Sequence, residues 1–147
     1  MTRFIWKLFT PLAAIIFVLA ACGGQPAQEA PVAPAQAVSG VELDLPVNID
    51  TQTLEEIRDR DDVVLIDVRE DWEYAEGHIP GATLIPLGQV PDRLAEIPKD
   101  KTVVAVCRSG NRSGQATNFL RQQGFDNVHN MQGGMNAWSQ AGFEVEQ

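Results

Sequence analysis

Short runs of apolar residues alternate with amphipathic segments along most of the chain. Continuous apolar runs are typical of strands that are buried on both faces of a sheet, and this chain has three strong ones and a weaker fourth: VVLIDV (63–68), ATLIPL (82–87), TVVAVC (102–107) and NVHNM (127–131). Between them, apolar positions recur with helical spacing in TQTLEEIRDR (51–60, after a capping-type Asp50), VPDRLAEI (90–97) and SGQATNFLRQQ (113–123). Strands that alternate with helices in this way predict an α/β fold, with a mostly parallel central sheet and helices on both faces.

The first 21 residues follow a different pattern, and we expect them to be a sorting signal. Arg3 and Lys7 precede an apolar run at residues 8–21. This run is shorter than the roughly 20 apolar residues that span a bilayer, and it ends in small residues. A charged start, an apolar middle and a small-residue end are the features of a secretory signal peptide.

The end of this signal, LAAC (19–22), resembles a bacterial lipobox, in which the cysteine is lipidated and becomes the mature N-terminus. We therefore expect lipidation of Cys22 and a lipid anchor in the bacterial cell envelope, on the extracytoplasmic side of the membrane. Two alternatives stay open: ordinary cleavage that leaves Cys22 as a free thiol, and a retained membrane anchor.

The stretch that follows Cys22 predicts a flexible tether. Residues 23–40 contain no aromatic residue and a single charge, and they are rich in Ala, Gln and Pro. Such a composition cannot bury enough apolar surface to offset the entropy lost on ordering. We therefore assign residues 22–46 to the lipidated cysteine and its tether, and residues 47–147 to one small folded domain.

Charge and cysteine content narrow the possible functions. The chain has 11 Lys and Arg against 20 Asp and Glu, for a net charge of −9, and an acidic protein is a poor binder of nucleic acid or of anionic lipid. Cys107 is the domain's only cysteine. In an exported protein, one remaining thiol is either reactive or pairs with another molecule. We further expect a monomer.

Cys107 opens a loop whose composition predicts an anion-binding site. The loop lies between a buried strand and a helix, where α/β sheets bind ligands and helix N-termini offer free N–H groups. Glycines at 110 and 114 let successive amides point inward as an anion nest, and two arginines follow the thiol. These groups favour the thiolate, so we expect a lowered pKa for the Cys107 thiol. The alternative is a half-buried cysteine at the end of a strand with unrelated surface arginines.

With this loop in view, residues 47–147 resemble a single-domain rhodanese (sulfurtransferase) module. The resemblance rests on four motifs: DVRE (67–70), EYAEGHIPGA (73–82), CRSGNRS (107–113) and GGMNAW (133–138).

The resemblance implies that Cys107 takes a sulfur atom from a donor such as thiosulfate or polysulfide, holds it as a persulfide, and passes it to a thiol or to cyanide. Arg108 and Arg112 would orient the oxyanion end of the donor. The loop amides would stabilise the thiolate and the persulfide, which makes the substrate-binding set Arg108, Ser109, Gly110, Asn111, Arg112 and Ser113. It implies no metal or organic cofactor.

Two other functions remain as alternatives. Cysteine phosphatases use a similar loop, but they place an arginine six residues after the cysteine, where this chain has Ser113. The smaller loop suits a sulfur atom better than a phosphoryl group. A non-enzymatic domain that only carries a persulfide or docks a partner is the second alternative.

Several residues outside the loop have mainly structural interpretations. Asp67 and Arg69 are candidate supporting residues of the site, but pairing of Asp67 with Arg69 or capping of a backbone amide explains Asp67 more simply. We expect His78 to be a hydrogen-bonded loop residue. The two histidines lie too far apart for a metal site. Trp138 is expected to pack the last helix onto the core, His129 to face the surface, and Trp72 either to cover the core or to line the edge of the site.

Overall fold

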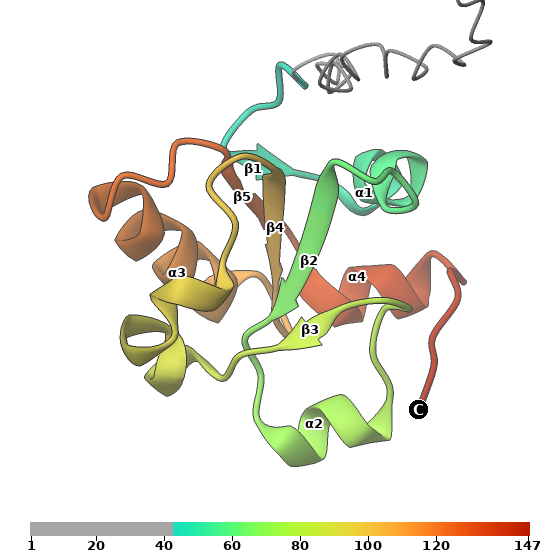
Figure 1. Cartoon of the computed structure of the whole chain (residues 1–147). Helices are drawn as coiled ribbons and strands as arrows, with labels where there is room; N and C mark the ends of the chain where they lie inside the picture. The colour runs from blue at the N-terminus through green and yellow to red at the C-terminus, as the bar shows by residue number, and fades with distance from the viewer. Residues whose placement is uncertain (1–42) are drawn as a thin grey trace, which may run out of the picture. The chain divides into compact units, whose positions relative to one another are not determined.

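The four predicted strands and a fifth, two-residue strand form one five-stranded sheet in the computed structural model, which describes residues 43–147. All neighbouring strands are parallel. Their order across the sheet is β1-β5-β4-β2-β3, and their bounds are β1 Asn48–Ile49, β2 Val63–Asp67, β3 Thr83–Leu84, β4 Thr102–Val106 and β5 Val128–Met131 (Figure 1). The predicted α/β class with a parallel sheet is confirmed.

Helices cover both faces of this sheet, as predicted. They are α1 (Thr51–Ile57), α2 (Asp71–Glu76), α3 (Asn111–Gln122) and α4 (Gly134–Gln140), with two short 3-10 helices, η1 (Leu87–Asp92) and η2 (Leu94–Glu96). In Figure 1, α1 and α4 lie on one side of the sheet and α3 on the other, while α2 lies near the end where the central strands stop. Side chains alternate along each strand, so the sheet supplies two separate apolar layers.

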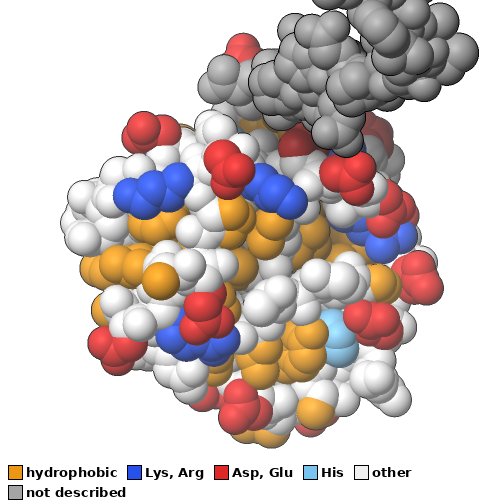
Figure 2. Space-filling view, in the orientation of Figure 1, with side chains coloured by type: hydrophobic (Ala, Val, Ile, Leu, Met, Phe, Trp, Pro, Cys, Tyr) orange, Lys and Arg blue, Asp and Glu red, His pale blue; other side chains and the backbone are white. Residues whose placement is uncertain are grey.

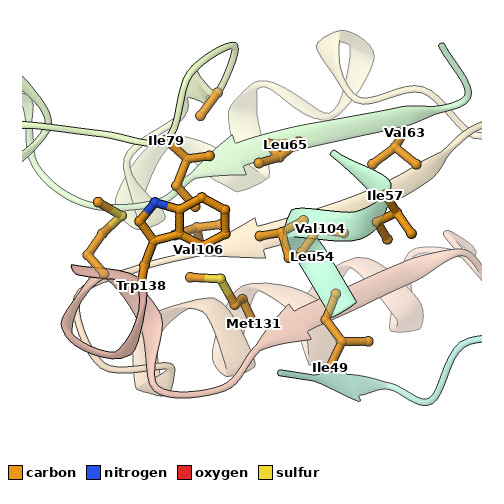
Figure 3. Close-up of a cluster of buried hydrophobic side chains, with 12 residues drawn as sticks. Ile49, Leu54, Ile57, Val63, Leu65, Ile79, Val104, Val106, Met131 and Trp138 are labelled. Atoms are coloured by element: carbon orange, nitrogen blue, oxygen red, sulfur yellow. The ribbon is translucent and has the colours of Figure 1, made fainter. Parts of the chain in front are cut away.

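One apolar layer lies between the sheet and helices α1 and α4. Leu65, Val104 and Met131 project from the strands toward this side (Figure 3). Leu54 of α1 and Trp138 of α4 are fully buried against them. The expected packing of Trp138 onto the core is therefore confirmed, and it fixes α4 beside the end of β4.

The second apolar layer lies under α3 and the two 3-10 helices. Ile66, Val103 and Ala105 point to this side, opposite to their neighbours in the strands. Ala116 and Leu120 of α3 pack on them. The position of α3, and therefore of the loop that leads into it, is set by this layer.

The structure differs from the predicted elements at several places, and α1 ends at Ile57, three residues before the predicted end. The segment at 90–97 forms η1 and η2 rather than one α-helix, and Pro91 lies inside it, where it supplies no backbone N–H donor. In place of the strand predicted at 82–87, the structure has the two-residue strand β3 at the sheet edge. The helix expected at 113–123 begins two residues earlier, at Asn111, because Gly110 adopts a left-handed conformation (φ 93°) that turns the chain into it.

The prediction that His129 faces the surface is wrong. The two-residue strand β1, which was not among the predicted strands, pairs with β5 on that side of the sheet. His129 is buried, and its Nδ1 lies 2.8 Å from the carbonyl oxygen of Pro46. The N-terminal edge of the domain therefore covers this side chain.

Acidic side chains are scattered over the face shown in Figure 2, with the basic ones in small separate groups. The predicted signal segment, Cys22 and the expected tether up to residue 42 lie outside the described residues and stay predictions, as do the domain boundaries drawn from them. No helix within residues 43–147 is long and apolar enough to cross a membrane.

Candidate functional site

The thiol of Cys107 lies at the carboxyl end of the central strand β4. Cys107 follows directly after the strand and has no exposed surface. The chain then passes through Gly110, whose left-handed backbone aims its own N–H at the sulfur, with the amide nitrogen 3.1 Å from Sγ. Helix α3 begins at the next residue. The sulfur is therefore held under a strand–loop–helix turn, as the sequence predicted for its position.

Hydrogen-bond donors from the loop surround this sulfur. Besides the Gly110 amide, the Ser113 hydroxyl oxygen lies 3.3 Å from Sγ. Burial by itself raises the pKa of the Cys107 thiol, but hydrogen bonds from the Ser113 side chain and from the amides of Ser113, Ser109 and Gly110 together lower the pKa below its ordinary value. The site favours the nucleophilic thiolate.

Arg112 is paired with a carboxylate that the sequence analysis did not identify. Its guanidinium donates two hydrogen bonds to Glu73 of α2, with N–O distances of 2.6 and 2.7 Å. Glu73 is buried, and the Arg112 hydrogen bonds outweigh its burial and lower its pKa to about 2. The charge of Arg112 is thus largely balanced, and its bidentate contact ties the first turn of α3 to α2.

Arg108 differs from Arg112, because its side chain is exposed and takes part in no hydrogen bond or ion pair within the described part of the chain. It lines a hollow of about 670 Å³ together with Trp72, Glu76 and Asn136. Trp72 is 61% exposed, so it lines the edge of this hollow and does not cover the core. The exposed indole of Trp72 and the guanidinium of Arg108, which has no partner among residues 43–147, therefore lie at the thiol-bearing loop.

The start of helix α4 holds the backbone of the loop in place. The amide of Met135 donates to the carbonyl of Cys107 at 2.8 Å, and the amide of Asn136 donates to that of Arg108 at 3.0 Å. Gly134 lies so close that a Cβ atom there would clash with the Cys107 carbonyl oxygen and with the backbone of Ser109. The motif GGMNAW is therefore the segment against which the loop is fixed.

Asp67 and Arg69 form the pair that the sequence suggested. Arg69 donates from its backbone amide and from its guanidinium to the Asp67 carboxylate, with a shortest distance of 2.7 Å. The same guanidinium donates to the carbonyls of Glu73 and Gly77, at 3.0 and 2.8 Å. The pair therefore holds α2 at the end of β2 and so places Glu73 in front of Arg112.

His78 is a hydrogen-bonded loop residue, as expected. Its Nδ1 lies 3.1 Å from the Tyr74 carbonyl oxygen, its Nε2 lies 3.2 Å from a Glu146 carboxylate oxygen, and its ring stacks on that of Tyr74. Within residues 43–147, no group of three or more His, Cys, Asp or Glu side chains could hold a metal ion.

A second residue that the sequence analysis missed lies behind Ser113. Asn130 of β5 accepts a hydrogen bond from the Ser113 hydroxyl, with an O–O distance of 2.6 Å. Its amide nitrogen donates in turn to the Asn48 side chain of β1 at 2.8 Å. Strands β1 and β5 are thus connected to the sulfur through the Ser113 hydroxyl group.

Comparisons with known proteins agree with this geometry. The family described as rhodanese-like domain matches residues 50–141. A protein of Allochromatium vinosum named "Sulfurtransferase" is 45% identical over 98 residues, which are 66% of this chain and 92% of that protein. "Thiosulfate sulfurtransferase GlpE" of Pseudoalteromonas translucida is 38% identical over 90 residues, which are 61% of this chain and 85% of that protein. The crystal structure of a rhodanese-like domain protein from Staphylococcus aureus superposes with a TM-score of 0.61 at 36% identity, over 69% of this chain and all of that one.

Proposed function

This chain belongs to the rhodanese-like domain family, and we propose that it is a sulfurtransferase that carries a sulfur atom as a persulfide on Cys107. The observation that carries the proposal is the environment of the sulfur. Loop amides donate toward a buried thiol at the end of the central strand, the Ser113 hydroxyl oxygen lies 3.3 Å from it, and these contacts hold its pKa below the ordinary value. Relatives named sulfurtransferases share most of the domain.

The proposed reaction has two halves. In the first, the Cys107 thiolate attacks the outer sulfur of a donor such as thiosulfate; the S–S bond of the donor breaks, and sulfite leaves with the bonding electron pair. The terminal sulfur of the new persulfide carries the negative charge, which the loop amides stabilise. In the second half, an acceptor such as cyanide or a thiolate attacks that terminal sulfur, and the Cys107 thiolate leaves.

The two arginines have different proposed roles. Arg108 is unpaired within the described residues and lines the hollow beside the loop, so we assign it the contact with the oxyanion end of the donor. Arg112 interacts electrostatically with Cys107 while its hydrogen bonds go to Glu73. We therefore assign it to holding the loop and to favouring anionic sulfur. Polysulfide fits the same site as a second donor.

The proposal is tested by thiosulfate:cyanide sulfurtransfer with the purified protein and its Cys107→Ser variant. We expect turnover only with the cysteine. Persulfide formation without turnover to any acceptor would identify a sulfur carrier instead. Hydrolysis of an aryl phosphate, without sulfur transfer from any donor, would identify a phosphatase.

We also propose that the domain works at the outer side of a bacterial membrane, anchored through lipid on Cys22. The support is the sequence LAAC (19–22) at the end of an apolar signal, followed by a stretch with a tether-like composition. Cys22→Ala is expected to block processing or to move the protein into the soluble fraction. Normal processing and normal membrane retention of that variant would contradict lipidation.

A further inference from the structure

A chain of three side-chain contacts connects the edge of the sheet to the sulfur. Asn48 of β1 accepts from the amide nitrogen of Asn130, whose amide oxygen accepts from the Ser113 hydroxyl, which in turn lies 3.3 Å from Cys107 Sγ. Asn130 and Ser113 are buried, while Asn48 is exposed. The outer end of the chain is therefore open to solvent and its inner end is closed.

The Ser113 hydroxyl has one hydrogen and two acceptors within reach. The shorter contact, 2.6 Å to the amide oxygen of Asn130, requires the hydrogen to lie there, because that oxygen has none of its own. The lone pairs of Ser113 then face the sulfur and suit a neutral thiol, whose S–H can donate to them. In this orientation every hydrogen bond of the chain runs outward, from Cys107 toward Asn48.

The opposite orientation suits an anionic sulfur. If both side-chain amides turn over, Asn48 donates to Asn130, Asn130 donates to Ser113, and the hydroxyl hydrogen points at the sulfur. No proton passes along the chain; the only proton lost is that of the thiol, which goes to solvent. If Asn130 did not turn, the rotated hydroxyl would leave its amide oxygen as a buried acceptor without a donor, which is costly.

We propose that Asn130 is a positioning residue that sets the direction of the Ser113 hydroxyl, and that Asn48 sets the direction of Asn130, so that this chain selects between the thiol and the anionic forms of Cys107. The inference deepens the proposed function and rests on it for its purpose, because sulfur transfer passes through a thiolate and an anionic persulfide. The chain would stabilise each anion only after it has reversed.

The charged groups near the sulfur do not depend on Asn130. They lie in the loop and on other elements around it: Arg108 in the loop, Arg112 in the first turn of α3, Glu73 paired with Arg112, and the Asp67–Arg69 pair at the end of β2. From the β5 side, His129 contacts Pro46 and is the one titratable residue of that strand. Exchanging Asn130 for a residue of similar size therefore changes the hydrogen-bond direction while these charges stay in place.

The test measures the rate of Cys107 alkylation by iodoacetamide against pH in the purified protein and in two variants whose new side chain has a similar size. The quantity compared is the midpoint of this profile, the pH at which the rate is half of its maximum. Asn130→Asp offers only acceptors and adds a negative charge, so the midpoint should rise by about one pH unit or more. Asn130→Leu offers no acceptor and frees the hydroxyl for the sulfur, so the midpoint should fall by about half a pH unit. A residue with a merely structural role would shift both midpoints in the same direction.

A second pair of variants acts from the exposed end of the chain, where folding is at little risk. The carboxylate of Asn48→Asp can only accept hydrogen bonds, so it favours the outward orientation and should raise the midpoint. Salt screens the added charge, so a rise that persists at high salt comes from the hydrogen-bond direction. Asn48→Ala releases Asn130 and should not raise it. When Ser113 is also replaced by alanine, none of the four substitutions should shift the midpoint through hydrogen bonding. Only the charge effect of the two aspartate variants should remain, and high salt should remove it.

Any of three results would overturn the inference. The midpoints do not shift, they shift in the same direction for Asn130→Asp and Asn130→Leu, or they shift equally when the Ser113 hydroxyl is absent. Thermal unfolding of every variant shows whether it is folded. Alkylation needs no sulfur donor, so a protein that transfers no sulfur would contradict the proposed function while these midpoints still decide the role of Asn130.

Discussion

Arg112 donates two hydrogen bonds to the buried carboxylate of Glu73, at 2.6 and 2.7 Å, and this pair connects the first turn of α3 to α2. The arginine that closes the thiol loop is therefore part of the scaffold as well as a source of positive charge. Because Arg112 has both roles, replacing it should change stability and catalysis for different reasons.

Arg112→Ala is expected to lower both stability and activity. It leaves the Glu73 charge buried without its partner, at a cost of about 2–3 kcal/mol in the free energy of unfolding. Loss of the positive charge that favours anionic sulfur should lower kcat/KM for thiosulfate about 10- to 150-fold. Denaturant unfolding and steady-state kinetics measure the two effects.

The double variant Arg112→Ala/Glu73→Gln is the matched control. Removing the buried charge should return most of the lost stability, while kcat/KM stays low. Full recovery of activity in the double variant would show that Arg112 acts only by neutralising Glu73.

The same ion pair predicts a pH dependence of stability. Glu73 has an ordinary pKa of 4.5 and a folded-state pKa of about 2, so its ionisation favours the folded state above pH 4.5, and this contribution is lost as the pH falls toward 2. The stability advantage of the wild type over Glu73→Gln should therefore shrink by roughly 3 kcal/mol across this range. Urea unfolding of both proteins between pH 6 and pH 2 checks it; a constant difference would show that the pKa is not lowered.

Gly134→Ala should disrupt the loop, because its Cβ would meet the backbone carbonyl of Cys107. Gly142→Ala is the control: its φ is also positive, at 76°, but nothing lies within 4 Å of the added carbon. The control should lose about 1–2 kcal/mol through backbone strain alone and keep its activity. We expect Gly134→Ala to lose more stability and most of its sulfur transfer; equal behaviour of the two variants would exclude a contact effect.

Arg108→Ala should affect donor binding without affecting the fold, because the guanidinium is exposed and unpaired within residues 43–147. We expect KM for thiosulfate to rise several-fold while the unfolding temperature changes little. The rise should be smaller at high salt, since screening already weakens the exposed charge in the wild type. An unchanged KM would move the donor contact from Arg108 to the loop amides.

The sequence predicted the fold and the position of the thiol because both follow from local patterns. The run at 102–107 marks a buried strand, and Gly110 marks the turn that follows it. The short strand β1 has only two residues, too few for a recognisable pattern, so its pairing with β5 was not predicted. The Pro46 carbonyl that His129 contacts lies just before this strand, so the burial of His129 was not predicted either.

Glu73 and Asn130 could not be found in the same way, because their partners are distant in sequence. Glu73 contacts Arg112 across 39 positions, and Asn130 contacts Asn48 across 82. Neither residue follows a periodic pattern, and a polar residue in a segment predicted to be a buried strand was the one available signal for Asn130. The packing of α2 and the pairing of β5 with β4 bring these groups to the loop.

The most direct test of the account is the mass of the intact protein after incubation with thiosulfate or polysulfide. We predict that the wild type gains one sulfur atom, that peptide mapping places it on Cys107, and that cyanide removes it with formation of thiocyanate. Cys107→Ser should gain nothing under the same conditions. A wild-type protein that gains no sulfur from any of these donors, or a Cys107→Ser variant that gains it equally, would contradict the proposed sulfurtransferase.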